Sequence, residues 1–128
     1  MKLLLDTHAL LWWLFDDPAL STRARDASAD RASTVYVSSA SAWELATKRR
    51  LGRLPHAEDA VKKLPELLSV AGFVALPITV AHALAAGFFA AEHRDPFDRM
   101  LIAQAAIEGL RLVSKDSAIT ALIAEVLW

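Results

Sequence analysis

The chain has 128 residues, of which 55% are hydrophobic, and this is enough material for one core, so we expect a single domain over residues 1–128. It contains no cysteine, which excludes disulfides and thiolate metal sites and fits a reducing cytoplasm, the location we expect. The formal net charge of −1 excludes a broadly basic surface, so any nucleic acid must bind locally, and the apolar stretches are too short or too interrupted by charges to be a signal peptide or membrane span.

The first half of the chain is predicted to alternate between strands and helices. Residues 2–5 read as a short buried strand and 9–15 as an apolar helix, followed by a helix that Ser21 caps. Residues 34–37 are β-branched and aromatic, which predicts a second strand, and the segment from about 41 to 51 has helical composition and ends at Gly52.

The second half repeats this alternation. A helix is predicted from about 58 to 70, broken or bent at Pro65, and a third strand at 73–76. Thr79 is expected to cap the next helix. Pro96 suits the first position of a helix that runs to about 108, and strands are predicted at 111–114 and 126–128.

Alternation of strands and helices indicates an α/β sandwich with a mainly parallel central sheet of four to five strands, because parallel neighbours need crossover connections. Ligands of such sheets bind beyond the carboxyl ends of the strands. Asp6 directly follows the first predicted strand, and Asp116 follows the fourth after Ser114 and Lys115. A lone aspartate after a strand is usually a turn former or helix cap, but two at equivalent places are expected to meet at one edge.

Two further acids have structural alternatives. Ser41 and Glu44 match the Ser-x-x-Glu capping box, and Glu44 is also placed to pair with Lys48 at i,i+4. Asp95 suits the helix N-cap position, whereas Asp98 lies in the first turn of a helix that is apolar nearly all round. A carboxylate leading into such a buried helix needs a partner, so Asp98 is the better candidate for chemistry.

The histidines, the tryptophans and Arg99 each have a structural reading beside a functional one. The four histidines show neither HxxxH nor HxH spacing, which argues against a dedicated zinc site. His8 reads as a helix-start residue, with a contact at the rim of the acidic site as the alternative. Four tryptophans are able to stack bases, but their apolar positions favour core or subunit interface: Trp12, Trp13, Trp43 and Trp128. For Arg99, the functional reading is that it orients phosphate or the acidic cluster, and the structural reading is that it is an exposed helical arginine.

Four segments taken together resemble the PIN-domain ribonucleases and, within them, the VapC-like toxins of bacterial and archaeal toxin–antitoxin pairs. These segments lie in the same order over nearly the whole chain: LLLDTHALLWWL (3–14), SSASAWELATK (38–48), HRDPFDRMLIAQA (93–105) and LVSKDSAI (112–119). Each segment alone is weak, and the combination is specific. The resemblance implies a PIN-like three-layer α/β/α sandwich.

The resemblance also implies the site and its chemistry. The acidic metal-site positions of the family match Asp6, Glu44, Asp98 and Asp116. Thr7, Asp95, Arg99 and Ser114 are expected around them as supporting residues. The implied cofactor is Mg²⁺ or Mn²⁺, which hard carboxylate oxygens bind well, and the implied activity is an endoribonuclease that hydrolyses RNA to 5′-phosphate products.

The resemblance implies three partners, namely an RNA substrate, a cognate antitoxin protein that covers the acidic site, and a second copy of the chain in a homodimer. Two other functions remain open at this stage. One is a PIN-fold module that binds a protein partner and has no nuclease activity. The other is a Mg-dependent aspartyl phosphoacceptor, which the sequence Asp6-Thr7-His8 disfavours because it lacks the DxD pattern.

Overall fold

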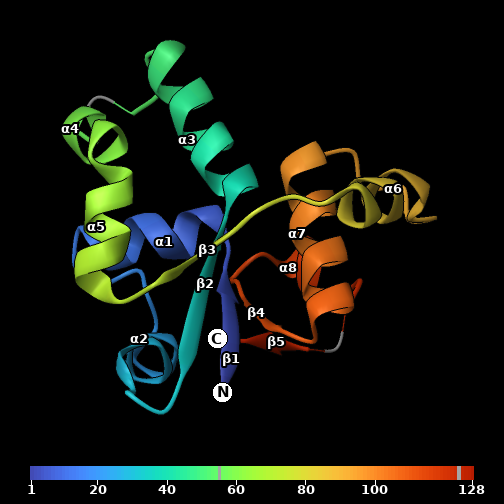
Figure 1. Ribbon diagram of the computed structural model, residues 1–128, viewed down its shortest axis with the longest axis horizontal. Coiled ribbons are helices and arrows are strands. Elements are labelled where there is room, and N and C mark those ends of the chain that lie inside the picture. Colours follow the sequence, from blue (N-terminus) through green and yellow to red (C-terminus); the bar gives the residue numbers. More distant parts are fainter. Residues whose placement is uncertain (55, 124) are drawn as a thin grey trace.

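The computed structural model describes residues 1–54, 56–123 and 125–128, and its elements alternate between helix and strand (Figure 1). The strands are β1 (Lys2–Leu5), β2 (Thr34–Ser38), β3 (Val74–Leu76), β4 (Arg111–Val113) and β5 (Val126–Leu127). The helices are α1 (Thr7–Leu14), α2 (Thr22–Ala29), α3 (Ser39–Arg50), α4 (Glu58–Lys62), α5 (Leu64–Ala71), α6 (Val80–Phe88), α7 (Pro96–Glu108) and α8 (Ser117–Thr120).

The strands form one sheet in the order β3-β2-β1-β4-β5, and every neighbouring pair is parallel. β1 therefore lies at the centre, with Leu5 opposite Val37 of β2 on one side and Val113 of β4 on the other. The predicted α/β sandwich with a parallel sheet is confirmed, with five strands. The carboxyl ends of β1 and β4 are neighbours, which is the arrangement that brings Asp6 and Asp116 to one edge.

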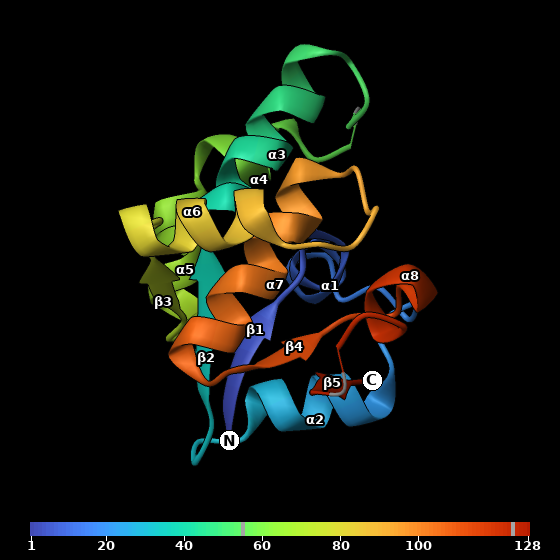
Figure 2. The ribbon, with the colours of Figure 1, turned by 90° about the vertical axis from the view of Figure 1, so that its right-hand side faces the viewer.

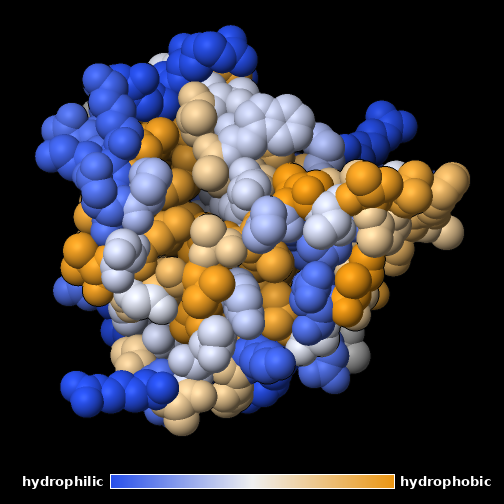
Figure 3. All heavy atoms as spheres, viewed as in Figure 1, coloured by the Kyte–Doolittle hydropathy of each residue, from blue (hydrophilic) through white to orange (hydrophobic). Residues whose placement is uncertain are grey.

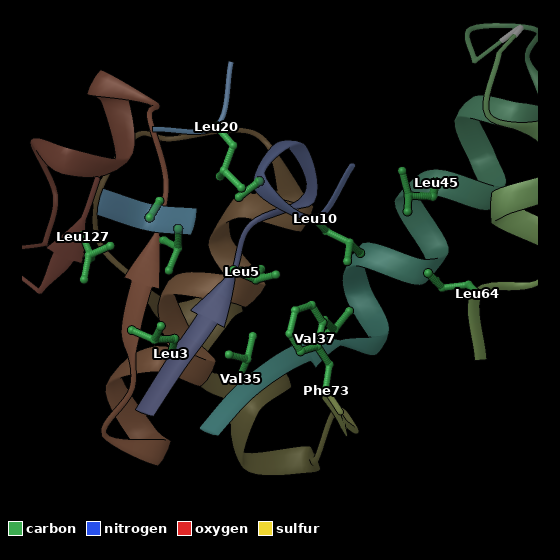
Figure 4. Packing of buried hydrophobic residues seen from close by; sticks show 13 residues of the cluster. Leu3, Leu5, Leu10, Leu20, Val35, Val37, Leu45, Leu64, Phe73 and Leu127 are labelled. Atoms are coloured by element: carbon green, nitrogen blue, oxygen red, sulfur yellow. The ribbon is translucent and has the colours of Figure 1, made fainter. Parts of the chain in front are cut away.

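Helices cover both faces of the sheet, as the two views in Figures 1 and 2 show. Alternate β1 side chains point to opposite faces, so Leu3 and Leu5 belong to one core cluster and Leu4 to another. The first cluster joins β1 and β2 to residues of α1, α2, α3 and α5, and Figure 4 shows Leu10, Leu45 and Phe73 in it. The second cluster joins Leu4 and β4 to α7 and α8. These apolar contacts fix the sheet edge on which the carboxylates lie.

Several predicted boundaries are wrong for local reasons. The break expected in the helix over residues 58–70 is present, but it lies at Lys63, where α4 and α5 meet, and Pro65 lies in the first turn of α5, where its missing N–H costs nothing. α3 begins two residues before the predicted position because Ser38, not Ser41, caps it by accepting from the Ala40 N–H at 3.0 Å. Ser21, Thr79 and Asp95 cap α2, α6 and α7 as predicted.

The surface is unevenly apolar. Hydrophobic side chains gather on the side that carries α6 in Figure 3, where Val80 is 76% exposed, Leu84 54% and Phe88 82%. These residues follow one another at intervals of four and therefore form one stripe on the outer face of the helix. Within the described residues, none of the helices combines the length and the hydropathy that spanning a bilayer requires.

Candidate active site

The site lies beyond the carboxyl ends of the two central strands. The Asp6 N–H donates to the Val113 carbonyl at 3.0 Å, so the ladder between β1 and β4 extends to the first residue of the site. Asp6 is only 5% exposed, whereas Asp116 is exposed at the start of α8. A cavity of about 400 Å³ runs beside both carboxylates, and its lining residues are Asp6, His8, Trp12, Lys115, Asp116 and Ser117. Asp6 and Asp116 therefore share one cavity, as the strand ends predicted.

Asp6 is held by two hydrogen bonds in a buried setting. Its Oδ1 accepts from the Ala9 N–H at 2.7 Å, which caps α1, and the Ser114 hydroxyl donates to the same carboxylate. Burial raises the pKa of Asp6 above its ordinary value, and the negative charge of Asp116 raises it further, although the Ser114 and Ala9 hydrogen bonds and the nearby His8 oppose the shift. Asp6 is thus a carboxylate for which a nearby cation would be favourable.

Asp98 lies in the first turn of α7, and its carboxylate forms a hydrogen bond with the side chain of a histidine. The distance between Asp98 Oδ2 and His93 Nε2 is 2.9 Å, and the two side chains are 20% and 18% exposed. Burial raises the pKa of Asp98, the His93 hydrogen bond lowers it, and the charges of Asp95 and Asp116 raise it. Asp116 therefore acts electrostatically on both Asp6 and Asp98, which places the three aspartates in one negative field.

Glu44 is buried in α3, and its carboxylate is neutralised by a lysine. The Lys48 Nζ lies 3.1 Å from Glu44 Oε2, so the i,i+4 pair is confirmed. The capping-box reading is wrong, because Ser41 lies inside α3 and its Oγ accepts from the Thr7 hydroxyl at 3.1 Å. This Thr7–Ser41 bond ties the start of α1 to the first turns of α3 and so links the helix of Glu44 to the residue after Asp6.

Three supporting candidates have specific contacts. Asp95 is exposed and caps α7 by accepting from the N–H groups of Phe97 at 2.9 Å and Asp98 at 3.2 Å. Ser114 Oγ accepts from the Asp116 N–H at 3.1 Å while its hydroxyl donates to Asp6, so it connects two of the acids. Arg99 is neither on the acids nor free in solvent, because its guanidinium donates to backbone carbonyls between Ala86 and His93.

His93 is the residue of this site that spacing rules missed. Histidine sites are usually recognised by the sequence spacing of zinc ligands, and His93 does not have that spacing. The signal was nevertheless in the HRDPFDR segment, where His93 stands five residues before Asp98 and shortly before the start of α7 at Pro96. His93 contacts the Asp98 carboxylate, and a contact of this kind does not follow the spacing rules for metal ligands.

The aromatic residues divide between the core and the surface. Trp12, Trp13 and Trp128 are half-buried and pack against the first core cluster, as predicted. Trp12 also stacks on His8 with ring centroids 5.7 Å apart, and its ring meets the edge of Trp128 at 5.6 Å. Trp43 is 62% exposed and packs on Phe97, so it lies outside the core, and the alternative of a subunit interface stays a prediction.

The donor set fits a hard divalent cation in type and charge. Across residues 1–54, 56–123 and 125–128, no three histidine, aspartate or glutamate side chains converge closely enough to enclose a metal ion as they stand. Mg²⁺ does not need such a cage, because it keeps several waters and commonly binds one or two carboxylates together with substrate phosphates. Burial is the main cause of the raised pKa values of Asp6 and Asp98, and the charge of Asp116 adds to both shifts, so a cation beside these carboxylates would be favourable.

Comparison with known proteins covers nearly the entire chain. Residues 3–124 match the PIN domain family. The chain is also 33% identical over 113 residues to Ribonuclease VapC22 of Mycobacterium tuberculosis (strain ATCC 25618 / H37Rv), a match that spans 88% of this chain and 85% of that protein.

Solved structures share the fold at low sequence identity. VapBC2 from Rickettsia felis, bound to a DNA fragment from its promoter, has a TM-score of 0.72 at 17% identity and covers 100% of this chain and 98% of that one. A toxin–antitoxin complex from Klebsiella pneumoniae has a TM-score of 0.64 at 18% identity, with coverages of 98% and 95%. VapC20 of Mycobacterium tuberculosis, described as a Sarcin-Ricin loop cleaving toxin, has a TM-score of 0.66 at 17% identity, with coverages of 94% and 94%. With the family match over residues 3–124 and the 33% identical relative, these results show that the chain belongs to the PIN domain family.

Proposed function

We propose that this protein is a Mg²⁺- or Mn²⁺-dependent endoribonuclease that hydrolyses RNA phosphodiesters and acts as the toxin of a toxin–antitoxin pair. The observation that carries the proposal is the shared negative field of Asp6, Asp98 and Asp116 at the carboxyl edge of a parallel sheet. Membership of the PIN domain family and the 33% identity to a ribonuclease support it. Burial raises the pKa of Asp6 and Asp98, and two such perturbed carboxylates at one edge of a sheet are typical of a functional site.

The residues of the site divide the work of hydrolysis. Asp6, Asp98 and Asp116 would hold the cation, and Glu44 would join them once Lys48 moves off its carboxylate. A bound Mg²⁺ or Mn²⁺ supplies two kinds of chemistry, a lowered pKa for water and neutralisation of charge on the phosphodiester. Attack by water leaves a 5′-phosphate and a 3′-hydroxyl, the products we expect.

A second cavity beside the acids has the chemistry of an RNA path. It measures about 630 Å³, shares Lys115 and Ser117 with the cavity beside Asp6, and is also lined by Arg23 and Trp128. Neither Arg23 nor Lys115 has an ion-pair partner within the described residues. Two free cations and an aromatic ring are what a single strand needs for phosphate contact and base stacking, and they reconcile RNA binding with a net charge of −1.

Two protein partners belong to the proposal. The fold is shared with toxins solved in complex with antitoxins, and an antitoxin that covers the acidic edge would keep this chain inactive. A second copy of the chain is the other partner, and the exposed stripe of Val80, Leu84 and Phe88 on α6 offers apolar surface for it (Figure 3).

The test is cleavage of single-stranded RNA by the purified chain with Mg²⁺ or Mn²⁺, with and without chelator. We expect cleavage that chelator abolishes and that Asp98→Asn reduces at least 100-fold, because the variant removes a charged oxygen ligand of the cation. Asp59→Asn, at an exposed acid of α4, is the matched control and should cleave like the wild type. Cleavage that persists in chelator, or in folded Asp98→Asn, would contradict the mechanism.

The cellular test uses the same logic. Expression of the chain without an antitoxin should arrest growth, and Asp6→Asn should relieve the arrest because it removes the buried carboxylate beside Asp116. Equal toxicity of a folded Asp6→Asn variant would argue against a metal nuclease. Labelling of the chain by acetyl phosphate at an aspartate would instead support the phosphoacceptor.

A further inference from the structure

The guanidinium of Arg99 is hydrogen-bonded to backbone carbonyls at the end of α6 and in the segment between α6 and α7. Its Nε donates to the Ala86 carbonyl at 2.9 Å, and its Nη1 donates to the carbonyls of Ala91 at 2.8 Å and His93 at 2.9 Å. Its Nη2 donates to the carbonyls of Gly87 at 3.4 Å and of Phe89. A guanidinium has five N–H donors in a fixed plane, and here every one of them has a carbonyl.

These five bonds fix the path of the chain between α6 and α7. The carbonyls of Ala86, Gly87 and Phe89 belong to the end of α6, where no further helical N–H is present to bond them. The carbonyls of Ala91 and His93 belong to the connecting loop. Arg99, in the first turns of α7, therefore holds the end of one helix and the loop that leads to its own helix, and a phosphate can contact it only if a carbonyl is released.

The loop that Arg99 holds places the His93 side chain beside Asp98. His93 Nε2 lies 2.9 Å from Asp98 Oδ2. A carboxylate oxygen accepts, so Nε2 carries the proton and donates. Asp98 Oδ1 has no hydrogen-bond partner among the described residues, so one oxygen of this carboxylate is held and the other is free.

We propose that His93 is a positioning residue that fixes Asp98 through Oδ2 so that Oδ1 is presented to Mg²⁺ or Mn²⁺, and that Arg99 in turn fixes His93. The proposal rests on the proposed function. Partners that orient a metal-binding carboxylate from outside typically change metal affinity by about 10- to 100-fold when they are removed. A lysine at position 99 has three donors on a flexible stem and cannot reproduce a planar set of five.

The experiment measures Mn²⁺ affinity of the RNA-free chain by electron paramagnetic resonance, where only free Mn²⁺ gives the sharp signal. We expect His93→Ala to weaken Mn²⁺ binding about 10- to 100-fold and His93→Gln, whose side-chain amide is also a donor, to restore part of the loss. Arg99→Lys should weaken binding in the same direction. Arg94→Lys, an exposed neighbour, and His56→Ala, an exposed histidine, are matched controls that should bind like the wild type.

A second readout keeps the test independent of folding losses and of catalysis. Nitrogen-15 spectra of the imidazoles should show the His93 proton on Nε2 in the wild type, and Arg99→Lys should perturb that signal while Arg94→Lys should not. Circular dichroism melts identify any variant that does not fold, and His93→Ala carries the test if Arg99→Lys is one of them.

The outcomes separate this inference from the proposed function. Wild-type chain that binds Mn²⁺ and cleaves RNA, together with a folded His93→Ala variant of unchanged Mn²⁺ affinity, would overturn the role of His93 and leave the nuclease intact. Wild-type chain that neither binds Mn²⁺ nor cleaves RNA would overturn both.

Discussion

Asp6 has two tasks that usually fall to different residues. Its Oδ1 caps α1 at the Ala9 N–H, and its charge lies buried beside Asp116 and Ser114. The N-cap position needs only a side chain that accepts a hydrogen bond. The buried negative charge, in contrast, is favourable only when a cation is near. Because the tasks depend on different properties of the side chain, a single substitution separates them.

Asp6→Asn should stabilise the chain in chelator at pH 7. Asparagine keeps the acceptor of the cap and removes the buried charge. The pKa of Asp6 is raised in the fold, so between the ordinary value of about 3.9 and the raised value the folded chain binds more protons than the unfolded chain, and stability falls as pH rises through that window. Thermal melts should therefore show a higher Tm for Asp6→Asn at pH 7 and a smaller difference below about pH 4.

The control for this comparison is Asp59→Asn, whose acid is exposed. A lower Tm of Asp6→Asn at pH 7 in chelator would mean that the carboxylate is stabilised by the fold without any cation. That result would remove the electrostatic reason for placing a cation there.

Single residues differ in how well sequence predicts them. Asp6 and Asp116 follow strands that a run of apolar residues marks, so their shared edge could be inferred from topology alone. Glu44 could be read as a cap, an ion pair or a ligand, because its position in the helix depends on whether Ser38 or Ser41 begins it. The HRDPFDR segment places His93 and Arg99 close to Asp98 in sequence, but the contact between His93 and Asp98 depends on the loop path that Arg99 holds, which the segment alone does not specify.

Among the elements, α7 is the one whose beginning carries the most function. Its N-cap, its proline at the first position, Asp98 and Arg99 lie within five residues, 95–99. Asp95 is exposed and bonds two backbone N–H groups, one of them that of Asp98. Asp95 therefore acts on the backbone of Asp98, and its charge adds to the field that raises the pKa of Asp98.

Substitutions of Asp95 distinguish a cap from a ligand. Asp95→Ala should lower the free energy of unfolding by about 1 kcal/mol, because two N–H groups lose their acceptor. Asp95→Asn keeps the acceptor and should retain both stability and RNA cleavage within a few-fold of the wild type. Urea unfolding and a cleavage assay measure the two effects, and loss of Mn²⁺ binding in a stable Asp95→Asn variant would make Asp95 a ligand.

Helix ends were the least predictable part of the elements. Caps at Ser21, Thr79 and Asp95 were predicted because each precedes a clear helical segment. α3 begins earlier than predicted because three serines, at 38, 39 and 41, offer competing caps and only tertiary contacts choose between them. The junction of α4 and α5 at Lys63 is explained by Pro65, which fits the first turn of a new helix but not the interior of a continuous one, so the break was predictable and only its exact position was not.

At the scale of the whole molecule, the parallel sheet was predictable and the strand order was not. Alternating strand and helix segments require crossovers, which indicates a parallel sheet. The order β3-β2-β1-β4-β5 depends on which strands pair with one another across long stretches of chain. β3 and β5 are only three and two residues long, so their sequences carry little information on their pairing. Resemblance to a known family supplied the part of the fold that periodicity alone leaves open.

Metal should stabilise the entire fold because it binds the native arrangement and not the unfolded chain. At a Mg²⁺ or Mn²⁺ concentration 100 times the Kd, the expected gain is about 2.7 kcal/mol. Thermal melts with increasing Mn²⁺ should show a rising Tm for the wild type and a much smaller rise for Asp6→Asn. A wild-type melt that saturating Mn²⁺ leaves unchanged would count against the acidic edge as a cation site.

The central position of β1 has a consequence for the order of synthesis. β1 is made first, yet its second neighbour, β4, begins at Arg111, and Asp116 follows Asp6 by 110 residues of chain. A ribosome that stops before Arg111 therefore releases a fragment whose central strand lacks one neighbour and whose acidic edge lacks Asp116. Interrupted translation of this gene should yield fragments that are harmless to the cell, so that only chains extended past Asp116 become toxic.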